Sequence, residues 1–195
     1  MSEGALRRDD RDLAARCARG ERHAQEAFFN AQKRRVHCIL YRILGGNREI
    51  EDVAQEAFVA IFRALPSYRG EASLATFVDR ITTRVALKNL RTEPARVALT
   101  VVVSQAPAAD ARAEAREGAR RLYAILARLP PKQHVAFSLH VIDGRSVREV
   151  AGLMEATEVA TRVRVFRARR AVESAAARDP VLASLLGLRE QEDGA

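Results

Sequence analysis

Apolar residues recur at steps of three and four along most of the chain, and this spacing constrains the fold more than any other feature. One stripe of this kind consists of Val36, Ile39, Leu40, Ile43 and Leu44. Residues at these steps share one face of an α-helix, where they can be buried against a neighbouring helix. Similar stripes follow at residues 50–62 and 74–90. The sequence therefore predicts an all-α protein.

The helical stripes fall into two groups, separated by a segment of different character. Residues 94–117 contain Pro94, Pro107, a valine run and many alanines, a composition that favours a flexible, extended linker. The prediction is therefore two small helical domains joined by this linker. The predicted segments are a tail at 1–19, a helical domain at 20–93, the linker at 94–117, a second helical domain at 118–176 and a tail at 177–195.

The second domain contains a short helix, a tight turn and a long basic helix. Ser146 and Glu149, three residues apart, have the spacing of a capping box that begins the short helix. Thr157 is a second capping residue, and the helix after it is rich in arginine. Helix, turn and basic helix in this order are the plan of a helix-turn-helix, whose second helix enters the major groove of DNA.

The basic helix needs one face toward its domain and one toward DNA. Val159, Val163 and Phe166 form an apolar stripe that is predicted to face inward. The predicted DNA-binding residues of this helix are Thr157, Thr161, Arg162, Arg164, Arg167, Arg169 and Arg170. Those near the helix start are expected at base edges and adjacent phosphates, and those further along at the backbone. The alternative is a basic helix that is merely solvated, or that lies on a membrane or a protein.

Charge and composition narrow the class of protein. The net charge is +8 and the sequence pI is about 10.4, which favours a polyanionic partner, although a basic pI can also serve solubility alone. Cys17 and Cys38 lack the spacing of a zinc or redox motif, so we expect no metal and no cofactor. The lack of a signal-peptide or membrane-spanning run predicts a cytoplasmic protein without membrane insertion. Without a phosphate-binding glycine loop or a nucleophile elbow, catalysis is not expected.

Two blocks of sequence resemble the extracytoplasmic-function, or group four, branch of the sigma-70 factors. The first is residues 50–58, IEDVAQEAF, and the second runs from residue 129 through residues 146–151 to residue 170. The resemblance spans about residues 20–175. It implies a transcription initiation factor that binds core RNA polymerase and directs it to promoters. The helix-turn-helix would read the upstream element in double-stranded DNA, while the first domain melts the downstream element.

The resemblance also assigns roles to residues of the first domain. Asp52, Gln55 and Glu56 match the helix that docks on the clamp helices of the polymerase's largest subunit, and helix geometry places them on one side, away from the apolar stripe. The residues matched to the locally melted downstream element are Tyr68, Arg69, Arg80, Arg84, Lys88 and Arg91. Such factors often have an anti-sigma partner, which is expected here as well.

The match departs from the family pattern at several positions. Phe77 stands where the family usually has Trp, Arg84 where it has Asn and Lys88 where it often has Asp. In the second domain, His134 stands where Arg is common and Glu155 where Gly is usual. These departures bear on specific base contacts and on the geometry of the turn. A different class also stays open, a stand-alone helix-turn-helix regulator that uses the first domain for dimerisation or sensing. Loss of binding to core polymerase would favour that alternative.

Overall fold

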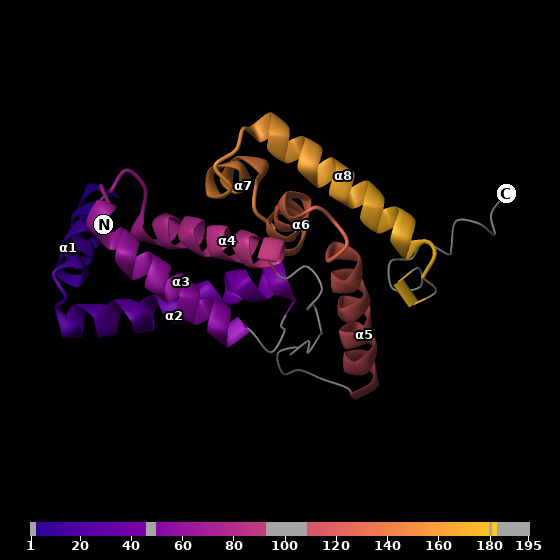
Figure 1. The fold of residues 1–195 in the computed structure, drawn as a ribbon, viewed down its shortest axis with the longest axis horizontal. Helices are drawn as coiled ribbons and strands as arrows, with labels where there is room; N and C mark the ends of the chain where they lie inside the picture. Colours follow the sequence, from indigo (N-terminus) through magenta and orange to yellow (C-terminus); the bar gives the residue numbers. More distant parts are fainter. Residues whose placement is uncertain (1–2, 46–49, 93–108, 180, 183–195) are drawn as a thin grey trace.

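The structure, a computed structural model, describes residues 3–45, 50–92, 109–179 and 181–182 (Figure 1). Within these residues every regular element is a helix, so the all-α prediction is confirmed. The valine run at 101–103, which was predicted as part of an extended connector, lies outside the described residues, as does most of the predicted tail at 177–195.

The first module consists of four helices, named here with their bounds. They are α1 (Glu3–Ala18), α2 (Arg22–Leu44), α3 (Ile50–Ala64) and α4 (Leu74–Thr92), with a short 3-10 turn at Leu65–Ser67. Helix α2 packs against both α3 and α4, and α3 packs against α4. Their shared core is built from the predicted stripes, and its fully buried side chains include Phe28, Ile39, Leu40, Ile43, Ile61 and Val78.

Helix α1 corrects the prediction of a tail at residues 1–19. It is helical from Glu3 to Ala18 and contacts α2, α3 and α4. Ala14 and Cys17 are buried there, because a short apolar face is hidden in an otherwise charged segment. The carboxylate of Asp10 accepts a hydrogen bond of 2.8 Å from the backbone N–H of Leu74. Helix α1 thereby satisfies one of the free donors at the start of α4.

The second module contains α5 (Ala109–Leu126), α6 (Pro131–Phe137), a π-helical turn (Ser138–Ile142), α7 (Val147–Leu153) and α8 (Glu158–Ala176). Helix α5 begins inside the segment that was predicted as linker. Its Arg121 binds Asp179, which follows α8, at 2.7 Å. Buried residues that hold α5, α6 and α8 together include Tyr123, Leu126, Phe137, Ala168 and Val172.

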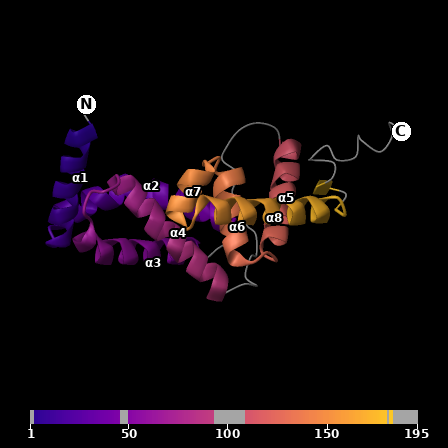
Figure 2. The same ribbon diagram turned by 90° about the horizontal axis from the view of Figure 1, so that it is seen from above.

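The two modules are packed against each other (Figure 2). Helices α6 and α7 contact α4, and the π-helical turn contacts α2. One continuous cluster of buried apolar side chains extends from the first module to Val135, Leu139 and Leu153 of the second. The sequence predicted two domains joined by a linker, whereas the described residues of both modules share a core.

The C-terminal end of α2 is one of the places where the modules meet. The Tyr123 hydroxyl donates to the carbonyl of Arg42 at 2.8 Å, and the His134 Nε2 lies 2.8 Å from the carbonyl of Ile43. The last carbonyls of a helix lack partners within the helix. Side chains of the second module therefore cap the end of α2, next to Gly45, which ends the helix with a φ of 78°.

Candidate polymerase and nucleic-acid interfaces

Helix α3 carries the residues that were matched to polymerase docking. Asp52, Gln55 and Glu56 are all exposed, whereas Val53 and Ala57 are buried on the opposite side. The Glu56 carboxylate accepts a hydrogen bond of 2.6 Å from the Lys88 Nζ of α4. Exposed pairs of this kind contribute about 1 kcal/mol or less, so a basic partner can displace it. The helix thus presents an acidic face to solvent.

Helix α4 presents the four cations that were matched to the downstream element. Arg80, Arg84, Lys88 and Arg91 are exposed at steps of three and four, which places them along one side of the helix. Part of this side faces the second module. A hollow of about 210 Å³ is lined by Arg80, Arg84 and Arg91 from α4 and by residues of the second module, among them Lys132, Met154 and Glu155.

The loop between α3 and α4 forms a pocket of about 390 Å³. Its lining residues are Ser67, Tyr68, Arg69, Gly70, Glu71, Ala72, Phe77 and Arg80. The Tyr68 hydroxyl donates to the carbonyl of Ala72 at 2.7 Å, and its ring meets Phe77 edge-on with 5.2 Å between ring centroids. Arg69 is exposed, and its carbonyl accepts a 2.9 Å bond from the Arg11 Nε.

Gly70 fixes the path of this loop. Its φ is 72°, a conformation that L side chains rarely adopt, and a Cβ at this position would lie 2.2 Å from the Nε of Arg11. Three features therefore fix the backbone path of the loop beside its pocket. They are the conformation of Gly70, the bond from Arg11 of α1 and the ring contact between Tyr68 and Phe77.

The capping residues of the helix-turn-helix are placed as predicted. The Ser146 hydroxyl accepts from the Glu149 N–H at 3.2 Å, and the Glu149 carboxylate accepts from the Ser146 N–H at 2.9 Å. The Ser146 hydroxyl also donates to the Glu149 carboxylate at 2.7 Å, and this bond, together with the one from the Ser146 N–H, lowers the pKa of Glu149. Thr157 caps α8 through a 3.2 Å bond from the Ala160 N–H. In the turn between the helices, Glu155 adopts a φ of 49°, at the position where the family usually has Gly.

The orientation of α8 corrects the sequence analysis. Val159, Val163 and Phe166 were predicted to face inward, but they are 69%, 43% and 61% exposed. The side of α8 that packs against α5, α6 and α7 carries Thr161, Val165, Ala168, Val172 and Ala176 instead. Small residues allow a closer approach of neighbouring helices, so this second stripe is the buried one. The periodicity alone could not decide between the two stripes.

Thr161 consequently drops out of the predicted DNA-binding set. Its side chain is fully buried, and its hydroxyl donates to the carbonyl of Thr157 at 3.0 Å. Thr157 itself is exposed, with its hydroxyl engaged as the helix cap. The remaining members of the set reach solvent: Arg162, Arg167, Arg169 and Arg170 are exposed, and Arg164 is half-buried. Arg162 pairs with Glu158 at 3.3 Å.

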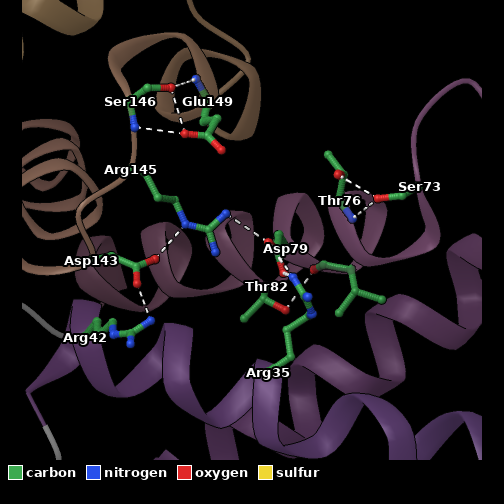
Figure 3. Close-up of polar contacts among 11 residues, drawn as sticks. Arg35, Arg42, Ser73, Thr76, Asp79, Thr82, Asp143, Arg145, Ser146 and Glu149 are labelled. Carbon is green, nitrogen blue, oxygen red and sulfur yellow. Dashed lines mark hydrogen bonds and ion pairs between the residues drawn. The ribbon is translucent and has the colours of Figure 1, made fainter.

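An ion network that was not predicted joins the two modules (Figure 3). Asp79 of α4 is 3% exposed, and both of its carboxylate oxygens lie 3.1 Å from the Arg35 Nη1. Arg145, just before α7, donates to Asp79 at 2.9 Å and to Asp143 at 2.6 Å. Asp143 also pairs with Arg42 of α2. The sequence carries no local signal for this network, because the partners of Asp79 lie 44 and 66 residues away along the chain.

No helix among the described residues is long and apolar enough to cross a membrane. The described part of the chain also holds no group of three or more His, Cys, Asp or Glu side chains that could bind a metal ion.

Comparison with known proteins assigns both modules to a family. Residues 28–96 match the model of sigma-70 region 2, and residues 119–172 match the model of sigma-70 region 4. These segments contain α3, α4, the helix-turn-helix and most of the residues described above. The chain therefore belongs to the sigma-70 family.

Relatives and a solved structure agree with this assignment. The RNA polymerase sigma-H factor of Pseudomonas aeruginosa is 26% identical, over 85% of this chain and 93% of the relative. The ECF RNA polymerase sigma-E factor of Escherichia coli K12 is also 26% identical, with the same coverage. A chain from the structure of CnrH in complex with the cytosolic domain of CnrY aligns with a TM-score of 0.60 at 23% identity, covering 87% of this chain and 98% of the matched chain. That last likeness concerns the fold.

Proposed function

We propose that this chain is a transcription initiation factor that binds core RNA polymerase and directs it to promoters. The observation that carries the proposal is the combination, in one chain of the sigma-70 family, of an exposed acidic face on α3 with a capped helix-turn-helix whose outer side is rich in arginine. The acidic face supplies contacts to a basic surface of the polymerase, and the arginines supply contacts to DNA.

The two modules have separate tasks in this proposal. Helix α8 reads the upstream element in duplex DNA, where arginine side chains contact base edges and phosphates. The loop pocket beside Tyr68 and Phe77 receives a base of the downstream element once the duplex opens. Unstacking a base costs a few kcal/mol, and stacking on aromatic side chains together with charge from Arg69 and Arg80 offsets that cost. The cations of α4 hold the phosphates of the same strand.

The partners follow from this assignment. Core RNA polymerase and promoter DNA, both double-stranded and locally melted, are the primary ones. We propose in addition a protein of the anti-sigma class, because the chain resembles the branch of the family that often has such a regulator. A factor that acts on RNA polymerase works in the cell interior.

Binding to core polymerase tests the polymerase contact directly. We expect the double variant Asp52→Arg, Glu56→Arg to lose binding to sigma-free core polymerase, because both substitutions reverse charge on the exposed side of α3. Its far-ultraviolet circular dichroism should stay unchanged. The matched control is Glu26→Arg, an exposed glutamate of α2 that pairs with Arg22. Equal affinity of the double variant and the control would contradict the assignment of this face.

A stand-alone regulator would behave differently in the same experiment. It would bind specific DNA tightly without polymerase and would show no measurable affinity for the core enzyme. We expect weak DNA binding by the free chain, because the cations Arg80, Arg84 and Arg91 line a hollow that faces the second module. We also expect measurable affinity for the core enzyme, through the exposed acidic face of α3.

A further inference from the structure

Helix α8 exposes an apolar stripe that the fold does not use. Six large hydrophobic side chains are exposed among the described residues, and three of them, Val159, Val163 and Phe166, lie on this helix. They follow one another at steps of four and three, so they form one continuous line. Exposed apolar residues that are grouped in this way mark a binding surface more often than single ones do.

The stripe lies on the outermost side of the helix. Successive residues of an α-helix are turned by about 100°, which places Val159, Val163 and Phe166 opposite the buried line of Val165, Ala168 and Val172. Figure 1 shows α8 along the outer edge of the second module, on the side away from α2 and α3. Nothing in the described part of the chain covers this side.

Arginines border the apolar stripe on both sides. The same rotation places Arg162 and Arg169 along one edge and Arg167 along the other, while Arg170 continues the line of the stripe beyond Phe166. A partner that fits this surface has a negative charge on two flanks and apolar groups between them. The major groove of DNA has this chemistry, because phosphates line both of its walls and the C5-methyl groups of thymine project into it. The stripe is one side chain wide, narrower than the apolar face of a helix that lies in a membrane surface.

We propose that α8 selects its upstream element through thymine methyl groups that pack against Val159, Val163 and Phe166, with the bordering arginines holding the phosphates of both strands. This inference rests on the proposed function, and it adds the chemistry that α8 reads. The A·T pairs carry a methyl group in the major groove and the G·C pairs do not. The element under the first half of α8 is therefore defined by the positions of its A·T pairs.

The test replaces thymine by uracil, which keeps every base-pair hydrogen bond and lacks only the methyl group. Core polymerase with the full chain first enriches duplexes from a promoter library that is randomised across the upstream element. The enriched element is then synthesised with uracil at one A·T pair at a time, and the affinity of the polymerase complex is measured for each duplex. We expect one to three pairs at which uracil weakens binding about fourfold, the effect of one buried methyl group.

A protein variant shows whether the stripe is the surface that senses the methyl groups. Val163→Ala should lose the response to uracil at one of these pairs and bind the thymine and uracil duplexes alike. Val141→Ala is the control, since Val141 is 40% exposed, close to the 43% of Val163, and lies on the π-helical turn. It should keep the full response.

The outcomes separate the inference from the proposed function. If no sequence is enriched, both are overturned. If a sequence is enriched but its A·T pairs tolerate uracil, or if Val163→Ala keeps the full response, the inference alone is overturned. The enriched sequence should also change when Val159, Val163 or Phe166 is replaced. If it does not, the stripe binds a protein partner or a second copy of the chain, and the inference is overturned.

Discussion

His134 shows how a single side chain can depend on the contact between modules. It is 1% exposed, and its Nε2–H donates to the carbonyl of Ile43 across the boundary between the modules. Burial, partly opposed by this bond, lowers the pKa of His134 to about 4. The ring is therefore neutral at pH 7. The family commonly has Arg at this position, and a fixed charge would be poorly accommodated in this apolar site.

The first prediction follows from that pKa. In the unfolded chain the ring gains a proton near pH 6.5, but in the folded protein it does so only near pH 4. Between these values the unfolded state binds more protons, so stability is present at pH 7 and falls as the pH decreases. We expect a loss of about 2 kcal/mol between pH 7 and pH 5. Urea unfolding at the two pH values measures it.

His134→Gln provides the control for this prediction. Glutamine can donate a hydrogen bond to Ile43 and does not titrate. The variant should lose most of the difference in unfolding free energy between pH 7 and pH 5, whatever its stability at pH 7. A pH dependence equal to that of the unaltered protein would show that His134 is not its source.

Among the elements, α8 carries the largest difference between sequence and structure. Its existence, its capping by Thr157 and its exposed arginines could be predicted, because capping and periodicity are local properties. Its rotation could not, since Val159, Val163 and Phe166 form as regular a stripe as Thr161, Val165 and Ala168. The choice depends on how closely α6 and α7 approach, and that is set by residues elsewhere in the chain. Thr161, which was predicted to contact DNA, is buried for this reason.

The rotation of α8 can be tested by stability alone. Val165 is 6% exposed and Val163 is 43% exposed. Val165→Ala should lower the free energy of unfolding by about 1–3 kcal/mol, because it removes buried methyl groups, whereas Val163→Ala should change it by less than about 0.5 kcal/mol. Thermal and urea denaturation of both variants measure the difference. The reverse order would return α8 to the orientation expected from the first stripe.

At the scale of the whole molecule, the main feature is the contact between modules. Two small domains could be predicted from the stripes and the linker composition, but their shared core could not. The reason is the distance along the chain between partners: Arg145 and Asp79 are 66 residues apart, and Arg42 and Asp143 are 101 apart. No local pattern identifies such pairs.

The α1 helix was missed for a similar reason, since Asp10 gains its partner, Leu74, only in the folded protein.

Asp79 is the residue through which this contact can be weakened. Asp79→Asn leaves Arg35 and Arg145 without their shared carboxylate, so we expect the free energy of unfolding to fall by about 1–3 kcal/mol, less than for a fully buried pair because Arg35 is 43% exposed. The control is Asp12→Asn, an exposed aspartate that pairs with Arg16 at 3.9 Å. Small-angle X-ray scattering should show a larger radius of gyration for Asp79→Asn only. Equal stability and size of the two variants would contradict this role.

Transcription in vitro shows whether this chain directs core polymerase to promoters. Sigma-free core polymerase is mixed with the purified chain and with genomic DNA fragments, and the 5′ ends of the transcripts are mapped. We expect transcripts that start at a defined set of sites sharing an upstream and a downstream element, and we expect them to disappear with the Asp52→Arg, Glu56→Arg variant. Transcripts that are absent, or that start at the same places without the chain, would contradict the assignment of this protein as a transcription initiation factor.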